Sequence, residues 1–124
     1  MRIASWSWGG RFHVGLISAD GGEATPLAVA DAERGALPLI RALVSGQTLP
    51  PEAGPRLPVP AITLRAPLPQ PQRNLFCVGR NYRAHAEELA GSVFRDNALQ
   101  KDEWPIVFSK VPETVIGPFD PVRL

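Results

Sequence analysis

The order of apolar and polar residues predicts antiparallel strands at the start of the chain. Residues 2–8 alternate in character, and residues 11–17 form a second strand-like run. Gly9-Gly10 joins the two runs, as in a β-hairpin. A third short strand is expected over residues 24–29, after a glycine-rich turn. The N-terminal part is therefore predicted to be a small hairpin-rich sheet.

Residues 36–46 follow a helical pattern instead. Their apolar side chains recur at intervals of three and four, so they share one face that can cover a small sheet. Pro38 is tolerated in a first helical turn, and Gly46 is placed to end the helix. The apolar residues of this face are Leu37, Ile40, Leu43 and Val44.

Proline becomes frequent between residues 49 and 72, with one strand-like island at 61–64. Prolines remove hydrogen-bond donors and favour extended backbone, so this stretch is interpreted as a semi-rigid connector. A proline-rich ligand for an adaptor domain is the alternative. It is less favoured because apolar residues that would pack on a neighbour are interleaved with the prolines.

The stretch 74–89 contains several polar residues of the types that commonly take part in catalysis. An apolar run ends at Gly79, a short polar turn follows, and a segment of helical composition carries His85 and Glu88. Positions three apart share a helix face, so the carboxylate can orient and stabilise the imidazole. Histidine titrates near neutrality and suits a general base. From spacing alone, a surface histidine with a chance acidic neighbour is the commoner explanation of such a pair.

Composition narrows the classes of protein. The chain has 124 residues, 44% of them hydrophobic, which is enough to bury a core. Its 13 basic and 12 acidic residues give a net charge of +1 without basic runs, so neither a nucleic acid nor a membrane is an expected partner. One cysteine, Cys77, indicates a reducing compartment, and no stretch reaches the length of a membrane span. A cytoplasmic location is expected.

The motifs of the second half resemble those of a known family. FCVGRNYRAHAEE, then PIVFSK, then VIGP, together covering residues 74–120, are similar to the start of the catalytic domain of the fumarylacetoacetate hydrolase (FAH) family. Residues 1–72 resemble, more weakly, the small β-rich module that precedes that domain in bacterial members. The expected fold class is therefore α+β and strand-dominated: an N-terminal module at 1–48, the connector at 49–72, and the beginning of the catalytic domain at 73–124.

The resemblance implies a metal-dependent enzyme acting on small oxo acids. Family members hold Mg²⁺ or Mn²⁺, which stabilises an enolate while C–C bonds of acylpyruvates or fumarylacetoacetate-like diketo acids are hydrolysed. Relatives decarboxylate or isomerise oxo acids with the same logic. By resemblance, His85 is the base and Glu88 its partner. Arg80, Tyr82 and Lys110 are the substrate-binding candidates, although solvated charges for the two cations and packing for the tyrosine remain open.

The chain departs from the family at the metal site. No E-x-E pair follows Glu88, so the metal ligands are expected outside this chain. Hard-cation binding needs several convergent oxygen atoms, and the 124-residue chain alone is therefore expected to be inactive. A homodimer is expected for the full-length protein.

Two further possibilities stay open. One is a non-catalytic interaction module, in which the proline-rich middle and an exposed strand edge serve docking. The other is phosphate binding at Gly79-Arg80-Asn81, which rests on a single glycine.

Overall fold

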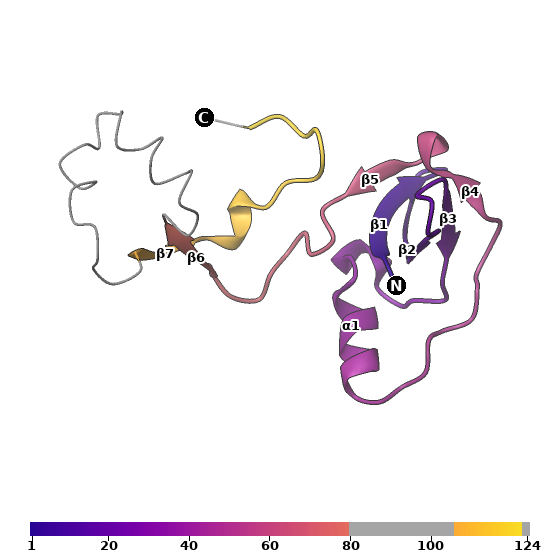
Figure 1. The fold of residues 1–124 in the computed structure, drawn as a ribbon, viewed down its shortest axis with the longest axis horizontal. Helices are drawn as coiled ribbons and strands as arrows, with labels where there is room; N and C mark the ends of the chain where they lie inside the picture. The colour runs from indigo at the N-terminus through magenta and orange to yellow at the C-terminus, as the bar shows by residue number, and fades with distance from the viewer. Residues whose placement is uncertain (80–105, 123–124) are drawn as a thin grey trace. The chain divides into compact units, whose positions relative to one another are not determined.

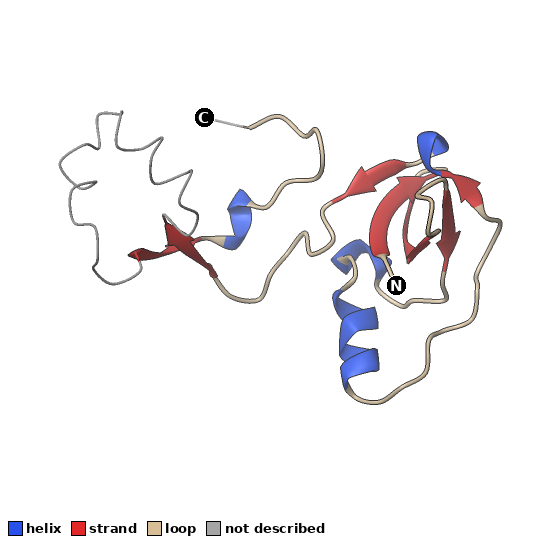
Figure 2. Cartoon of the chain, viewed as in Figure 1, coloured by secondary structure: helices blue, strands red, loops and turns tan. Residues whose placement is uncertain are grey.

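The computed structural model describes residues 1–79 and 106–122. Strands dominate this part of the chain and one α-helix accompanies them, as predicted for an α+β protein (Figure 2). Contacts group the chain into two compact units: Met1–Gln72 with Pro112–Leu124 (unit 1), and Arg73–Val111 (unit 2). No helix among the described residues combines the length and hydrophobicity needed to cross a membrane.

Unit 1 is built on a curled five-stranded antiparallel sheet with the order β4-β3-β2-β1-β5 (Figure 1). The predicted hairpin is confirmed, since Trp6 pairs with His13 and Trp8 with Arg11. Gly9 and Gly10 both have positive φ, 56° and 73°, as a tight two-residue hairpin turn requires. The strands are β1 (Ile3–Trp8), β2 (Arg11–Ile17), β3 (Glu23–Pro26), β4 (Leu57–Pro58) and β5 (Thr63–Arg65).

The proline-rich stretch 49–72 differs from the expected connector, because it supplies both outer strands of this sheet. β4 pairs with β3, and β5 pairs with β1. Proline is tolerated in outer strands, where one side of the backbone has no ladder partner. A high proline content therefore did not prevent pairing; it confined these short strands to the two edges. A single 3₁₀ turn, η2 (Val59–Ala61), separates them.

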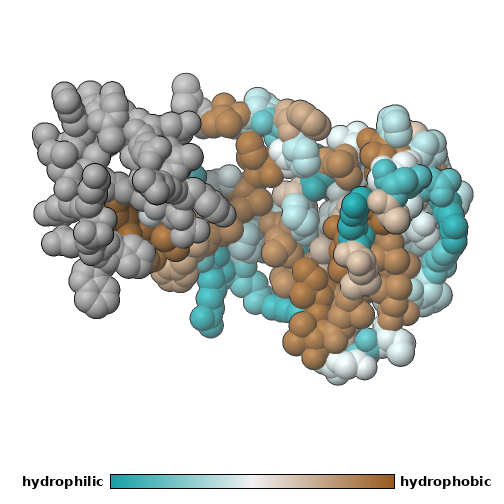
Figure 3. Space-filling model, viewed as in Figure 1, coloured by the Kyte–Doolittle hydropathy of each residue, from teal (hydrophilic) through white to brown (hydrophobic). Residues whose placement is uncertain are grey.

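Helix α1 (Leu37–Val44) confirms the predicted helix and packs on one face of the sheet. The predicted covering face is wrong in part, because Leu39 is the buried residue whereas Ile40 and Val44 are exposed. Leu39 (1% exposed) meets Val14, Leu27 and Ala36 in the buried cluster between helix and sheet. The 3₁₀ turn η1 (Ala32–Arg34) precedes α1. Figure 3 shows hydrophobic residues over α1 on the face in view, where Val44 is 83% exposed. The inner face of α1 thus forms the core, while its outer face keeps apolar groups in contact with solvent.

Trp6 fills the opposite face of the sheet. Residues paired across an antiparallel ladder share a face, so Trp6 lies on the side of His13, away from Val14. Its side chain is fully buried, and its ring stacks on that of His13 with centroids 6.0 Å apart. The buried indole nitrogen has no hydrogen-bond partner among the described residues.

Residues 112–122 belong to unit 1, although they follow strand β7 (Ile106–Lys110) of unit 2. Gly117 is buried, and a Cβ there would lie 3.3 Å from the Ala66 nitrogen. A turn forms at residues 117–120: the Gly117 amide donates to Asp120 Oδ2 (2.8 Å), and the Asp120 amide donates to the Gly117 carbonyl (3.2 Å). The contacts thus divide residues 73–124 between the two units, whereas the sequence predicted one segment. The reason is that residues 112–122 pack against the backbone of unit 1 near Ala66. A short 3₁₀ turn, η4 (Pro112–Thr114), begins this stretch.

Candidate functional site

Unit 2 contains two strands, one before and one after the H-x-x-E segment. β6 (Leu75–Gly79) and β7 (Ile106–Lys110) pair antiparallel as an isolated two-stranded ladder. The register places Gly79 opposite Ile106 at one end and Leu75 opposite Lys110 at the other. Segment 80–105 therefore leaves the ladder and rejoins it at the same rung.

Four of the five candidate site residues belong to that segment. Arg80, Tyr82, His85 and Glu88 lie outside the described residues, so their roles stay predictions. What the described residues contribute is the anchoring of both segment ends. The backbones of directly opposed residues lie about 5 Å apart, and the ladder fixes where these residues enter and leave unit 2.

Lys110 is the one candidate whose position is described. It is exposed and lies opposite Leu75, four rungs from the pair formed by Gly79 and Ile106. At about 3.4 Å per residue, that is roughly 14 Å along the ladder. The register alone does not bring the backbone of Lys110 to the end from which Arg80 follows. Shared contact with one substrate carboxylate depends on the path of residues 80–105.

Both faces of the β6–β7 ladder carry apolar side chains. Phe76 (80% exposed) and Val107 (59%) lie on one face, while Cys77 and Phe108 (43%) are paired on the other. Cys77 is half-buried, whereas Phe108 is exposed. Two-stranded ladders are marginal in water unless further structure packs on them. The ladder is thus suited to burial on both sides.

The described residues do not fit the divalent metal that the resemblance implies. Within residues 1–79 and 106–122, no group of three or more His, Cys, Asp or Glu side chains could hold a metal ion. Mg²⁺ binding requires convergent oxygen ligands.

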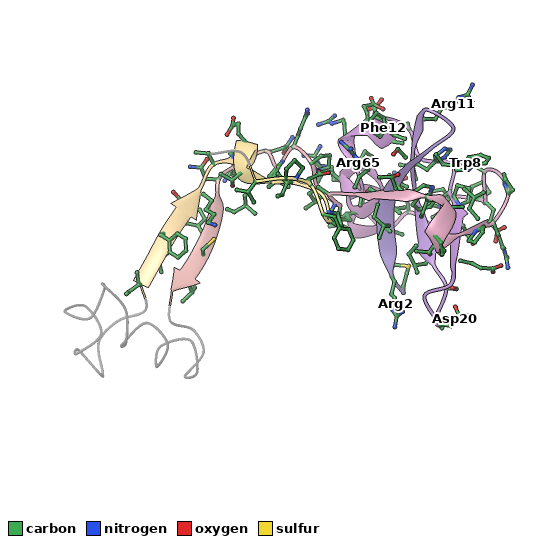
Figure 4. The ribbon with its side chains drawn as sticks, turned by 90° about the horizontal axis from the view of Figure 1, so that it is seen from above. Arg2, Trp8, Arg11, Phe12, Asp20 and Arg65 are labelled. Atoms are coloured by element: carbon green, nitrogen blue, oxygen red, sulfur yellow. The ribbon has the colours of Figure 1, made fainter. Side chains whose placement is uncertain are left out.

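A second polar cluster, in unit 1, was not singled out by sequence reasoning. The Arg65 guanidinium lies 5.8 Å from the centroid of the Phe12 ring (Figure 4), and both residues line a cavity. The two residues come from β5 and β2, strands that are far apart in sequence. No local motif signals their meeting, because it depends on the pairing of β5 with β1.

Comparison with known proteins decides the family. The family model for the C-terminal domain of fumarylacetoacetate hydrolase matches residues 74–124, which include the ladder and the H-x-x-E segment. Residues 74–124 are thus similar to this domain of the FAH family. The match begins at the residue before β6, and the resemblance of the motifs is thereby confirmed.

Two curated relatives share an activity in their names. Oxaloacetate tautomerase YisK of Bacillus subtilis is 40% identical over 62 residues, which cover 50% of this chain and 19% of the relative. The mitochondrial oxaloacetate tautomerase Fahd2a of Rattus norvegicus is 32% identical over 124 residues, covering 90% of this chain and 35% of the relative. The chain therefore spans about a third or less of the length of these two relatives.

A solved structure supports the fold of nearly the whole chain. The fumarylacetoacetate hydrolase from the psychrophilic Exiguobacterium antarcticum superposes with a TM-score of 0.61 and 26% sequence identity. The superposition covers 98% of this chain and 39% of that one. The small sheet of unit 1 is thus included in the likeness to an FAH-fold protein.

Proposed function

We propose that the full-length protein containing this chain interconverts the keto and enol forms of a small oxo acid of the oxaloacetate class. The observation that supports this is the shared name of the relatives at 40% and 32% identity, both oxaloacetate tautomerases. Tautomerisation is one of the enolate reactions that the sequence motifs imply. The proposal therefore replaces C–C hydrolysis as the first candidate.

In this proposal His85 moves the proton. Its imidazole removes a proton from the carbon beside the carbonyl group; the C–H electron pair forms the C=C bond, and the carbonyl oxygen takes a proton to give the enol. A histidine with a pKa near neutrality can act as base and acid in the same cycle. Glu88, three positions further along the sequence, stabilises the protonated ring. Arg80 and Lys110 pair with the substrate carboxylates.

Replacing His85 by Ala in the full-length protein tests this role. The rate of enol loss, followed by ultraviolet absorbance of oxaloacetate, is expected to fall by about 10²-fold or more if His85 is the base. His13→Ala is the matched control, because His13 is the other histidine of the chain and lies on β2 in unit 1. An unchanged rate in His85→Ala would remove this residue from the mechanism.

C–C hydrolysis is the second candidate, supported by the likeness to the Exiguobacterium fumarylacetoacetate hydrolase. The same proteins are assayed with an acylpyruvate and with oxaloacetate, each with and without Mg²⁺. Cleavage of the acylpyruvate without enol–keto exchange of oxaloacetate would favour hydrolysis. Exchange without cleavage would favour the tautomerase. The 124-residue chain assayed alone is expected to show neither reaction.

A further inference from the structure

Unit 1 contains a cavity of about 290 Å³ beside the outer strand β5. Its described lining contains none of the residues proposed to act on the oxo acid. At about 30 Å³ per water-sized group, it holds a ligand of roughly ten non-hydrogen atoms. Its walls come from three places: the β1–β2–β5 part of the sheet, the turn η1, and the stretch 66–70. The side chains used below are Ser5, Phe12, Glu33, Arg65 and Pro69.

The backbone around this cavity is held by contacts distant in sequence. The Pro67 carbonyl accepts hydrogen bonds from the Ala36 amide (2.7 Å) and from Ser5 Oγ (3.4 Å). Gly35 has a φ of 68°, and a Cβ there would lie 2.5 Å from Pro69 Cδ. Only glycine permits this approach without strain. The η1 wall and the 66–69 wall are therefore fixed to each other in the free protein.

One side of the cavity presents a cation on an aromatic support. Arg65 is paired with Ser5 on β1, and Phe12 is paired with the next residue on the same face, Ser7. This diagonal arrangement places the guanidinium 5.8 Å from the Phe12 ring centroid, within cation–π range. Arg65 has no carboxylate within ion-pair distance among the described residues. Its donors are available for a ligand.

The other side presents a carboxylate. Glu33 lies on η1, lines the same cavity, and has no ion pair with Arg65 or with any other described cation. A dianion would be repelled by Glu33, and a simple cation by Arg65. The remaining lining includes Ala32, Ala66 and Pro69, which are apolar. A cation from β5 and an anion from η1, which line one cavity together with these apolar residues, match a zwitterion with an apolar body.

We propose that this cavity binds a free α-amino acid with an aliphatic side chain. Arg65 takes the carboxylate in a two-point hydrogen bond, Glu33 takes the ammonium group, and the apolar lining takes the side chain. The ligand satisfies both charges in the cavity at once. The site belongs to unit 1, and its occupancy does not depend on the oxo-acid reaction.

Binding is measured by titrating the 124-residue chain with L-leucine and following backbone amide NMR shifts. Saturable shifts are expected at Gly35, Phe12 and Ala66, with a Kd of about 1 mM. Two analogues each lack one charge: 4-methylpentanoate has no ammonium group, and 3-methylbutylamine has no carboxylate. Each is expected to bind about tenfold more weakly or worse. Equal binding of leucine and either analogue would overturn the proposal.

Three variants locate the site. Arg65→Gln and Glu33→Gln are expected to weaken leucine binding by about tenfold or more. Arg34→Gln, a neighbouring charge on η1 that does not line this cavity, should leave it unchanged. If Arg65→Gln fails to fold, Glu33→Gln still tests the proposal, because Glu33 is exposed. Absence of saturable binding, full affinity in Glu33→Gln, or an Arg65–Glu33 ion pair that excludes leucine would each refute the proposal.

Discussion

At Gly15 the backbones of β2 and β3 and the ring of Trp6 come together with no space for a side chain. A Cβ would meet the Thr25 carbonyl, and would lie 2.8 Å from Trp6 Cη2 and 2.9 Å from Pro26 Cα. The glycine is therefore required for packing. Its φ is ordinary, and a side chain is excluded first by the Thr25 carbonyl of β3 and then by the Trp6 ring and Pro26. The largest buried side chain of unit 1 is accommodated by the smallest residue beside it.

Gly15→Ala is expected to lower the free energy of unfolding of the chain by about 1–3 kcal/mol or more, because an added methyl group forces backbone or ring to move. Urea denaturation followed by tryptophan fluorescence measures this. Gly22→Ala is the matched control, since a Cβ there would meet only Asp20 Oδ2, at 3.4 Å. Its effect should stay within about 0.5 kcal/mol. Equal losses in the two variants would contradict the packing argument.

Asp20 lies in the turn before β3 (Figure 4), and the ionisation of its carboxyl group affects the stability of the folded state. The Ser18 hydroxyl donates to Asp20 Oδ1 (2.5 Å), and so does the Gly22 amide (3.1 Å); these bonds hold the pKa of Asp20 below its ordinary value of 3.8. The folded state favours the carboxylate. Its stabilising effect is present above pH 3.8 and is lost as the pH falls through the lowered pKa.

Removing the Ser18 hydroxyl should therefore raise the pKa of Asp20 towards 3.8. The pKa is read from the carboxyl ¹³C shift during an acid titration of Ser18→Ala and of the unmodified chain. Ser45→Ala, an exposed serine at the end of α1, serves as control. Identical Asp20 titrations in all three proteins would show that the hydroxyl does not act on this carboxylate.

At the scale of elements, α1 stabilises unit 1 through one side of its surface. Leu39 is 1% exposed against Val14 and Leu27, whereas Val44 is 83% exposed. Only the buried side adds hydrophobic stabilisation. The helix holds one face of the curled sheet, while Trp6 fills the other without a helix.

Leu39→Ala should reduce the free energy of unfolding by about 2–5 kcal/mol, because it leaves a cavity under α1. Val44→Ala on the same helix should change it by less than about 0.5 kcal/mol. Both values come from urea denaturation followed by circular dichroism. A loss at Val44 as large as that at Leu39 would mean that α1 packs through a different face.

At the scale of the molecule, unit 1 is assembled from two segments separated in sequence by unit 2. Residues 1–72 form the sheet and helix, and residues 112–122 return to β5 at Gly117. In sequence, unit 2 is therefore an insertion between the two segments of unit 1.

Gly117→Ala tests this return. A Cβ would lie 2.9 Å from Asp120 Oδ2 and 3.3 Å from the Ala66 nitrogen, so residues 112–122 should detach more readily. Hydrogen exchange at the Val115 and Asp120 amides is expected to become about tenfold faster, equivalent to about 1.4 kcal/mol. Glu113→Ala, exposed in η4, should leave it unchanged. Unaltered exchange in Gly117→Ala would show that the glycine does not anchor the segment.

Local signals in the sequence predicted the elements whose causes are local. Gly9-Gly10 gave the hairpin, the spacing of Leu37 to Val44 gave α1, and the apolar runs at 75–79 and 106–110 gave β6 and β7. The motifs of residues 74–120 also identified the family. Of the predicted site, only Lys110 lies among the described residues, and the roles of His85, Glu88, Arg80 and Tyr82 stay predictions.

The amino-acid sequence by itself determined the turns, the helix, the strand segments and the family, because each depends on residues close together along the chain. Tertiary structure alone decided that the proline-rich stretch 49–72 supplies two edge strands, that Gly117 returns to β5, and that Arg65 meets Phe12. The physical reason is that strand pairing joins distant segments. Which backbone edge is free and which surface leaves room for a neighbour are settled only when the sheet has formed.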